Sequence, residues 1–570
     1  MRIKIFKLSV VCAFIFMAFM LINLQLIQGR KLRELSNKNR IRLIPQQGAR
    51  GKILDRYGNV IVDSELSYDV MVSPGDREGL DDTFGAIAKI LGISRQELKA
   101  RFNKGGVSSF SPVTVADNIE IKKAIALEEL KTEYNGIVIQ PKALRHYPHG
   151  TLACHVIGYL NEIDHWRLTK LEDYGYRTKD IVGFGGVEER YDYYLRQEEG
   201  GLSQEVNNAG KFVRVLGFRP PKSGKDIQLT LDLKIQKIVE EAMGERRGAV
   251  VIMDPYTGEI IAMASRPAFA PQAIIKNSAK YLPAIFQDSG APMINRAISG
   301  SYPAGSVFKI TVAAGALENA KINYATTFFC PGHMRIGKRN FACWSTHNQE
   351  NLNQALIHSC DVFFYHTGLL MGPQLIRDYA LKFGLGKPTG IDLPYEVGGL
   401  VPDPLWRKIY KFRNWFDGDT ANFSIGQGDL LVTPIEVTRA MAVFANKGFL
   451  VTPYIVSAVA GQDISSAQRK SIKLPLKENT INYIRRGLKG VIDDPTGTGN
   501  VLFIPGLQIA GKTGSAQVAR QAAHGWFAGF VPFDKPKFVL CVFLENGGAG
   551  YYSCVLAKQI LEKMRAEGLI

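Results

Sequence analysis

Residues 302–309 have the sequence Tyr-Pro-Ala-Gly-Ser-Val-Phe-Lys, and this stretch decides both the fold and the chemistry that we expect. The Pro-Ala-Gly turn cannot continue a helix backwards, whereas residues 310–320 are good helix formers. Ser306 is therefore predicted at a helix N-terminus, with Lys309 one turn later on the same face. A serine hydroxyl becomes a nucleophile when a base takes its proton, and an uncharged lysine amine can be that base. The simpler alternative is a capping serine beside a solvated lysine.

A second motif, Lys-Thr-Gly-Ser at residues 512–515, lies in a strand-like run. Lys512 offers a cation, both to an anionic substrate terminus and to favour the uncharged form of Lys309. Thr513 offers a hydroxyl to a carboxylate, and Gly514 lets a substrate backbone approach closely. A strand of this kind can hold a peptide by strand addition while amides point at the reacting carbonyl. The alternative is an ordinary edge strand with a tight turn.

Between these two motifs lies Ser359-Cys360-Asp361, in a stretch predicted to be helical from 352 to 368. Ser359 can relay a proton from Lys309 to a leaving amine. The tripeptide alone carries no information. The order S-x-x-K, S-x-D and K-T-G along one chain is the specific signal, and it indicates serine acyl transfer.

The segments around these motifs predict the fold. Apolar runs at 248–253 and 259–264 flank an Asp-Pro-Tyr-Thr-Gly turn and predict a hairpin. Two strands, a helix-rich insert, three more strands and a helix predict an α+β domain with a mainly antiparallel sheet. The three later strands and the closing amphipathic helix are predicted at residues 507–518, 525–531, 538–544 and 554–567.

The N-terminal segment indicates a membrane anchor. Residues 8–27 are almost wholly apolar, and about 20 such residues suffice to cross a bilayer. Arg2, Lys4 and Lys7 precede the apolar run, which favours a cytoplasmic N-terminus, but basic residues at 30, 31 and 33 follow it, so local charge alone does not decide the orientation. A cleaved signal peptide is the alternative, but no small-residue cleavage site follows the run. We therefore predict an uncleaved, single-pass anchor.

Composition and the positions of glycine and proline indicate the partners and the domain division of the chain. The 570 residues carry a net charge of +17, which suits an anionic membrane surface or an acidic polymer. Nucleic acid is not an expected partner, because no helix-turn-helix, RRM or zinc-finger signature occurs. A Gly/Pro-rich break at 218–224 predicts a linker. The expected domains are an anchor at 1–28, a non-catalytic pedestal at 29–218 and a catalytic domain at 225–570.

Three of the seven cysteines and one histidine fall in one region. Cys330, Cys343, His347 and Cys360 form the pattern C-x12-C-x3-H-x12-C, and three thiolates with one imidazole are a recognised structural-zinc set. A metal here would hold the Ser359 motif rigid. A disulfide or buried free thiols are the alternatives, and His333 or His358 could replace one ligand.

These motifs resemble those of the class B penicillin-binding proteins, and most closely those of elongation-type members. Further landmarks agree, namely 424–428, 524–527 and 544–548 in the second half and 147–148, 155–158 and 186–191 in the first. The S-x-D motif departs from the S-x-N of many relatives. A carboxylate only accepts hydrogen bonds unless it is protonated, so the amide-type contact to substrate is in question.

The resemblance implies a penicillin-binding, β-lactamase-like transpeptidase domain on an elongated α+β pedestal. In this reading Ser306 attacks the D-Ala-D-Ala carbonyl of a stem peptide, Lys309 is the base and Ser359 shuttles the proton. Lys512 and Thr513 hold the terminal carboxylate, and Asp361 borders the cleft. The N–H groups of Ser306 and Ser515 form the oxyanion hole. β-Lactams are expected to acylate Ser306 as substrate mimics.

The resemblance also implies a setting. The chain is expected in the cytoplasmic membrane with its catalytic domain in the periplasm. Its implied partners are a SEDS-type glycosyltransferase and elongation scaffold proteins, with no organic cofactor. A zinc site occurs near this region in elongation-type relatives. The competing functions are a septal transpeptidase, a D,D-carboxypeptidase or β-lactamase, and a β-lactam sensor or scaffold.

Overall fold

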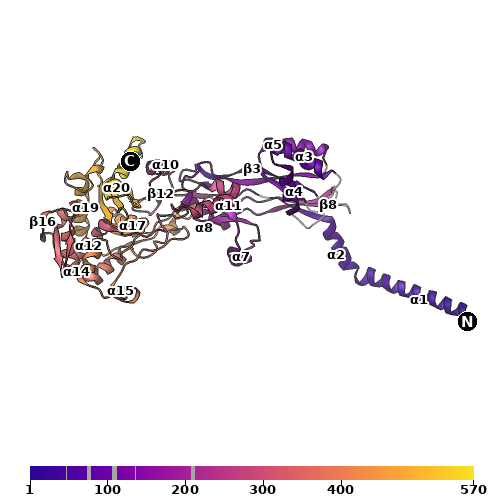
Figure 1. The fold of residues 1–570 in the computed structure, drawn as a ribbon, viewed down its shortest axis with the longest axis horizontal. Coiled ribbons are helices and arrows are strands. Elements are labelled where there is room, and N and C mark those ends of the chain that lie inside the picture. The colour runs from indigo at the N-terminus through magenta and orange to yellow at the C-terminus, as the bar shows by residue number, and fades with distance from the viewer. Residues whose placement is uncertain (47, 74–78, 105–111, 135, 207–211) are drawn as a thin grey trace. The chain divides into compact units, whose positions relative to one another are not determined.

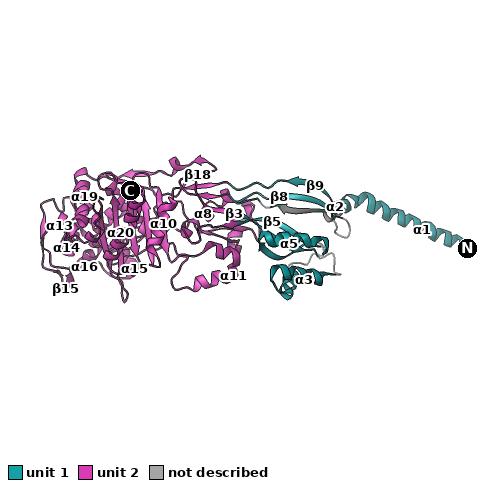
Figure 2. Cartoon of the chain, turned by 90° about the horizontal axis from the view of Figure 1, so that it is seen from above, with its two compact units in different colours: residues 1–51, 64–144, 196–224 teal, residues 52–63, 145–195, 225–570 magenta. Residues whose placement is uncertain are grey.

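The computed structural model describes residues 1–46, 48–73, 79–104, 112–134, 136–206 and 212–570. The chain divides into two compact units, coloured separately in Figure 2. Unit 1 comprises residues 1–51, 64–144 and 196–224, and unit 2 comprises residues 52–63, 145–195 and 225–570. The chain therefore passes between the units several times.

Unit 1 begins with the apolar helix α1 (Arg2–Ile22), which continues through a π-helical turn (Asn23–Ile27) before α2 (Gly29–Arg40). The stretch Arg2–Ile27 is long and apolar enough to cross a membrane, and none of its residues is buried. An apolar helix without a buried face is unstable in water, because its side chains gain nothing from a protein core.

The rest of unit 1 is α+β. Strands β1 (Ile41–Gln46), β8 (Gly200–Val206) and β9 (Phe212–Arg219) form an antiparallel sheet. Strands β4 (Val113–Ile119) and β5 (Ile137–His146) both pair with β3 (Val60–Val72). Their apolar core also contains residues of α3 (Leu80–Leu91), α4 (Arg95–Lys104) and α5 (Ile121–Glu129). Strand β4 ends at Ile119, and α5 begins directly after it at Ile121.

Unit 2 contains the predicted antiparallel sheet (Figure 1). Its order is β12 (Ile260–Arg266), β11 (Gly248–Met253), β23 (Phe538–Leu544), β22 (His524–Val531) and β21 (Ala510–Ala516), and every neighbouring pair is antiparallel. Alternate residues of β11 face opposite cores. Val250 and Ile252 pack with α10 (Leu233–Met243) and α20 (Gly550–Ala566), whereas Ala249 and Val251 share a core with α17 (Pro434–Ala445). The predicted α+β class and the five predicted strands are confirmed.

The insert between β12 and β21 carries most of the remaining elements. It is helix-rich as expected, but it also holds two small two-stranded sheets, β13 with β16 and β14 with β15, that the apolar pattern did not predict, because their strands are short and largely exposed. Its elements are α11 (Pro271–Gln287), a 3-10 turn (Gly305–Phe308), α12 (Lys309–Glu318), β13 (Thr327–Cys330), β14 (His333–Ile336), β15 (Arg339–Ala342), β16 (Asn348–Asn351), α13 (Leu352–Ile357), α14 (Asp361–Lys382), α15 (Pro404–Lys411), α16 (Asp417–Ser424) and α19 (Glu478–Asp493).

A smaller part of unit 2 packs around a second sheet. In it β18 (Val456–Val459) pairs with β10 (Ile227–Leu229), which pairs in parallel with β2 (Ile53–Leu54). The remaining elements of unit 2 are α6 (Cys154–Ile157), β6 (Tyr159–Glu162), α7 (His165–Leu171), a 3-10 turn (Glu172–Tyr174), β7 (Ile181–Phe184), α8 (Gly186–Arg190), α9 (Asp192–Leu195), β17 (Phe449–Val451), β19 (Gln462–Asp463), α18 (Ser465–Gln468), β20 (Ser471–Lys473) and a 3-10 turn (Asn500–Leu502).

Acid is expected to destabilise unit 2 through His155. This histidine is buried, its Nε2 lies 2.7 Å from the Pro292 carbonyl oxygen, and burial lowers its pKa to about 4 from the ordinary 6.5. A lowered folded-state pKa means that its stabilising contribution is complete above pH 6.5 and is lost as the pH falls toward 4. From pH 7.5 to pH 5 the loss is about 2 kcal/mol.

Melting temperatures measured between pH 5 and pH 8 test this expectation. His155→Gln keeps a donor for the Pro292 carbonyl but does not titrate, so its melting temperature should depend less on pH than that of the unaltered protein. The exposed His149, changed to Gln, is the matched control and should keep the full slope. Equal slopes in all three proteins would show that His155 is not the titrating group.

Candidate active site

The turn that carries Ser306 is fixed from two sides. The Trp526 indole Nε1 donates to the Pro303 carbonyl at 3.0 Å, and the Gly305 N–H donates to the Gly426 carbonyl at 2.8 Å. Gly305 has φ +56°, and a Cβ there would lie 2.8 Å from the Ser515 carbonyl oxygen. Only glycine combines this backbone conformation with so close an approach. Ser306 follows directly and is only partly buried, so its hydroxyl lies at the edge of the domain interior.

Lys309 is the first residue of α12, and its side chain has 0% exposure. Its Nζ donates to three acceptors, the Ser359 carbonyl at 2.8 Å, the Ser359 Oγ at 3.2 Å and the Asp361 Oδ1 at 2.7 Å. An ammonium group has three donors, and these three acceptors occupy all of them. Of the three acceptors, only Asp361 is a carboxylate, and its Oδ1 makes the shortest of the three contacts.

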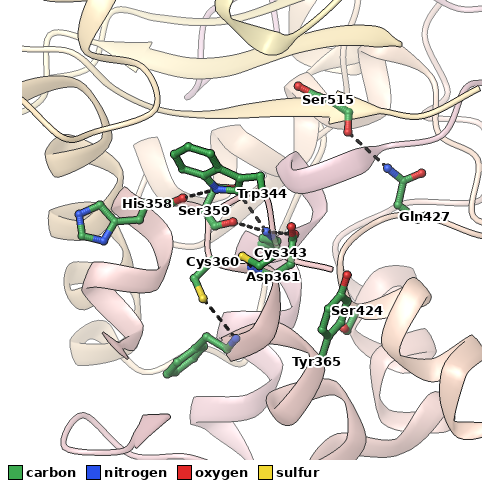
Figure 3. A network of polar contacts seen from close by, with 12 residues as sticks. Cys343, Trp344, His358, Ser359, Cys360, Asp361, Tyr365, Ser424, Gln427 and Ser515 are labelled. Carbon is green, nitrogen blue, oxygen red and sulfur yellow. Dashed lines mark hydrogen bonds and ion pairs between the residues drawn. The ribbon is translucent and has the colours of Figure 1, made fainter. Parts of the chain in front are cut away.

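Ser359 does not lie in a continuous helix as expected. Helix α13 ends at Ile357 and α14 begins at Asp361, with the Cys360 Sγ accepting the Phe363 N–H at the start of α14. Ser359 itself has φ +53°, an uncommon conformation for a residue with a side chain. At this break both oxygen atoms of Ser359 face Lys309. Figure 3 shows Ser359 and Asp361 side by side beneath the strand that carries Ser515.

Lys512 lies inside the domain and not on its surface. Its side chain is fully buried, and its Nζ donates to the Thr513 carbonyl at 3.2 Å. Burial, and then repulsion from Lys309, hold the pKa of Lys512 well below its usual value. The structure thus places the two lysines within electrostatic reach, as the sequence predicted, but it does not place Lys512 as an exposed cation.

The rest of β21 lines the same site. The Thr513 Oγ1 lies 2.8 Å from the Thr498 Oγ1, a residue that sequence analysis missed because Gly-Thr-Gly at 497–499 has no distinctive chemistry. A Cβ on Gly514 would lie 3.1 Å from a side-chain carbon of Val307, so this glycine lets β21 pack against the Ser306 turn. That packing is a reason for Gly514 besides the substrate approach that we expected.

Ser515 connects β21 to two neighbouring segments. Its carbonyl accepts the Gln427 side-chain amide at 3.3 Å, and its Oγ accepts the Gly550 N–H at 2.9 Å. Figure 3 shows Gln427 reaching toward Ser515. Gln427 belongs to the Ser-Ile-Gly-Gln-Gly landmark at 424–428. These contacts fix the position of the strand end opposite the Ser306 turn.

The four residues of the predicted metal set come together. The ligand atoms of Cys330, Cys343, His347 and Cys360 all lie within 4.8 Å of one another. The His347 Nδ1 is 3.6 Å from the Cys330 Sγ and 3.5 Å from the Cys343 Sγ. Ligands around a tetrahedral zinc ion are separated by about 3.5 Å, so the donor set fits this metal in number, type and spacing. All seven cysteines are free thiols.

The cysteine cluster contacts the catalytic motif directly. The Cys343 Sγ accepts the backbone N–H of Asp361 at 3.2 Å, and Cys360 is the residue before it. His358 was an alternative ligand, but its Nδ1 lies 2.9 Å from Glu350 Oε1 and its Nε2 lies 2.9 Å from Thr496 Oγ1. His333, the other alternative, is also outside the group of four.

Comparisons with known proteins agree with this geometry. The "Penicillin binding protein transpeptidase domain" matches residues 248–565, and the "Penicillin-binding Protein dimerisation domain" matches residues 45–229. The chain is 32% identical to the peptidoglycan D,D-transpeptidase MrdA of Acinetobacter baumannii, over 95% of this chain and 84% of the relative. It is 30% identical to MrdA of Escherichia coli K12, over 95% and 90%.

Solved structures show the same fold. The penicillin-binding protein PBP2 of Helicobacter pylori aligns with a TM-score of 0.80 at 28% identity, covering 93% of this chain and all of that one. The same protein in complex with MreC aligns with a TM-score of 0.81. A chain from a peptidoglycan synthase complex that coordinates polymerization and crosslinking aligns with a TM-score of 0.74 at 26% identity, covering 98% of this chain and 97% of that one.

Proposed function

This chain belongs to the class B penicillin-binding proteins, and we propose from that premise how its residues perform D,D-transpeptidation. It is a peptidoglycan D,D-transpeptidase of the elongation type, a serine enzyme that cross-links stem peptides and that β-lactams acylate. Ser306 is the nucleophile. The observation that carries the assignment is the convergence of the Ser306 turn, Lys309, Ser359 and the Lys512 strand on one site.

In the first half-reaction the Ser306 Oγ attacks the carbonyl carbon of the penultimate D-Ala. Its proton passes to the Lys309 amine, and the N–H groups of Ser306 and Ser515 stabilise the oxyanion. The bond to the terminal D-Ala then breaks, and Ser359 carries the proton from Lys309 to the departing amine. The products are an ester on Ser306 and free D-Ala.

In the second half-reaction the amine of another stem peptide attacks this ester. A new amide forms, the ester bond breaks, and the proton of the amine returns to the Ser306 oxygen through the same relay. Thr513, with Lys512 behind it, holds the terminal carboxylate of the donor. Asp361 takes the proton that Lys309 must lose at the start, and a protonated Asp361 can then donate a hydrogen bond like the asparagine of S-x-N relatives.

Labelling with a fluorescent penicillin followed by peptide mapping tests the nucleophile. The label should be found on the peptide that contains Ser306 and on no other serine peptide. Rapid turnover of the penicillin by the purified protein would instead favour a hydrolase, and a label on another serine would contradict the assignment. The septal, carboxypeptidase and sensor alternatives have no specific observation in their favour.

The cysteine cluster is proposed as a structural zinc site. Cys330, Cys343, His347 and Cys360 would hold the ion, which would supply rigidity and no reaction step. The buried His347 Nε2 has no hydrogen-bond partner among the described residues, whereas the His347 Nδ1 faces the thiols of Cys330 and Cys343. Because Asp361 donates its N–H to Cys343, a fixed cluster fixes the catalytic carboxylate.

Metal removal should therefore weaken both stability and acylation. Protein purified under reducing conditions is expected to hold one zinc per chain by mass spectrometry of its metals. A strong chelator should lower its melting temperature by about 5 °C or more and slow its labelling by penicillin. Cys330→Ser should lose the metal, whereas the control Cys541→Ser, at a buried cysteine outside the cluster, should keep it.

Absence of stoichiometric zinc in the unaltered protein would refute the metal site. A disulfide would show as two fewer alkylated cysteines under non-reducing conditions, and it would favour the alternative.

The location, the partners and the domain division of the enzyme are also proposals. Helix α1 would anchor the chain as a single pass, with the catalytic domain in the periplasm. An elongation scaffold protein and a SEDS-type glycosyltransferase are the proposed partners, because matched structures are of PBP2 with MreC and of a peptidoglycan synthase complex. The domain boundaries 1–28, 29–218 and 225–570 remain the proposed division of the chain.

A further inference from the structure

The surface around α15 exposes an unusual set of side chains. Five large apolar residues are more than half exposed, and exposed basic residues alternate with them. We name this set the α15 patch, and it comprises Leu405, Lys408, Ile409, Tyr410, Lys411, Phe412, Arg413 and Phe416. Isolated exposed apolar residues are normal, but a contiguous group of this size on a soluble surface marks an interaction site.

Phe412 shows most clearly that the patch is retained although it lowers the stability of the fold. It is 88% exposed and has φ +55°, the left-handed conformation in which a helix usually ends on glycine. A bulky residue in this conformation is strained, and an exposed aromatic ring gains nothing from the protein core. The site therefore keeps an aromatic ring where glycine would fold more easily.

The charges of the patch are available to an anionic ligand. Arg407, on the inner side of α15, is occupied by Asp419 at 3.0 Å and Asp429 at 3.4 Å. In the part of the chain that the structure describes, neither Lys408 nor Arg413 makes an ion pair. Cations without partners beside flat aromatic rings suit a ligand that combines carboxylates with apolar ring faces.

A neighbour of the patch in the chain, Trp415, contacts rings that lead to the turn of Ser306. Trp415 contacts the Phe423 ring with centroids 6.0 Å apart, and Phe423 stacks on Phe308 at 5.6 Å. Phe308 belongs to the 3-10 turn that carries Ser306. Two ring contacts therefore connect Trp415, which lies in the chain between Arg413 and Phe416, to the nucleophile turn. Helix α16, which follows the patch in the chain, leads to Gln427 beside Ser515.

We propose that the α15 patch binds the peptidoglycan strand whose stem peptides react at Ser306. In this inference, which rests on the proposed function, pyranose rings stack on Phe412 and its aromatic neighbours. Carboxylates of neighbouring stem peptides pair with Lys408 and Arg413. The enzyme thereby selects polymer over isolated stem peptide. An anionic bilayer fits less well, because the exposed Asp417 adjoins the patch and a continuous anionic surface would repel it.

Two variants of the full-length protein separate charge from ring stacking. Lys408→Glu/Arg413→Glu reverses the free cations, and Phe412→Gly removes the ring while it relieves the left-handed backbone. Binding is measured by co-sedimentation with purified uncross-linked peptidoglycan strands at low and high salt. Each variant should bind about tenfold more weakly, and the loss in the charge variant should shrink at high salt. Phe412→Gly should melt at the same temperature as the unaltered protein or about 2 °C higher.

The matched control is Lys276→Glu/Lys280→Glu, which makes the same change of charge on exposed positions of α11 and should bind strands normally. Cross-linking rates are divided by the amount of protein that fluorescent penicillin labels, so that misfolded protein does not count. The inference is overturned if the unaltered protein does not bind strands, or if the variants bind as it does. It is also overturned if they lose binding to phosphatidylglycerol vesicles instead.

The transpeptidase function and the strand-binding role of the α15 patch would be disproved by different results. If penicillin does not label Ser306 in the unaltered protein, the proposed function fails whatever the patch binds. If labelling and cross-linking are normal and both patch variants cross-link strands at the full rate, only the strand-binding role of the patch is lost.

Discussion

Ser306→Ala is expected to abolish acylation by fluorescent penicillin and to reduce cross-linking by at least about 1,000-fold. The alanine cannot form the ester on which both half-reactions depend, and residual rates in serine acyl-transfer enzymes without their nucleophile come from binding and oxyanion contacts alone. Labelling on a gel measures the first effect, and analysis of cross-linked stem-peptide products measures the second.

The fold should survive this change. Ser306 is only partly buried, and the turn around it is fixed by backbone and indole contacts that alanine keeps. Ser301→Ala, a serine five residues earlier, is the control and should be labelled normally. A Ser306→Ala protein that folds, fails to bind penicillin covalently and still cross-links strands would refute the acyl-enzyme mechanism.

Lys309 carries the second large effect. Lys309→Ala should slow acylation by about 1,000-fold, because a positioned general base contributes two to four orders of magnitude. It also leaves the Asp361 carboxylate without the partner that lies 2.7 Å away. Acylation rates by stopped-flow or time-resolved labelling measure the loss.

Lys309→Arg separates proton transfer from charge. A guanidinium group can still pair with Asp361, but it cannot give up its proton and act as a base. If Lys309 is the base, the arginine variant should be as slow as the alanine variant. Recovery of acylation in the arginine variant would show that Lys309 supplies only positive charge.

Asp361→Asn extends the same test. The side-chain oxygen of asparagine can still accept a hydrogen bond from Lys309, but the proton acceptor that we propose for the amine is gone. Acylation should fall by about tenfold, because the carboxylate that we propose as the proton acceptor is gone. A rate that is unchanged at all pH values would contradict the role that we give to Asp361.

Much of the catalytic unit could be predicted because its signals are local. Apolar runs predicted all five strands of the main sheet, and the Asp-Pro-Tyr-Thr-Gly turn predicted their first hairpin. The spacing of Cys330, Cys343, His347 and Cys360 predicted four ligand atoms that do come together. In each case a few neighbouring side chains specify the structure, whatever the rest of the chain does.

Other features have no local signal. Nothing in the residues around Ser359 predicts its positive φ, and its contact with Lys309 joins segments that are far apart in the chain. Thr498 became part of the site only because the loop after α19 meets β21. The two small sheets of the insert were missed because four-residue strands are too short for an apolar pattern to distinguish them from loops.

The sequence by itself determined which groups can react. In chain order these are Ser306, Lys309, Ser359, Asp361 and Lys512. Tertiary structure alone decided how deeply each group is buried and which charged groups lie beside it. Lys309 and Asp361 are 52 residues apart in the chain, and Lys512 is completely buried. Burial and charge pairing depend on segments brought together by long-range packing, and these set the proton affinity of a side chain. Chemical identity is a property of single residues, whereas reactivity is a property of the assembled environment.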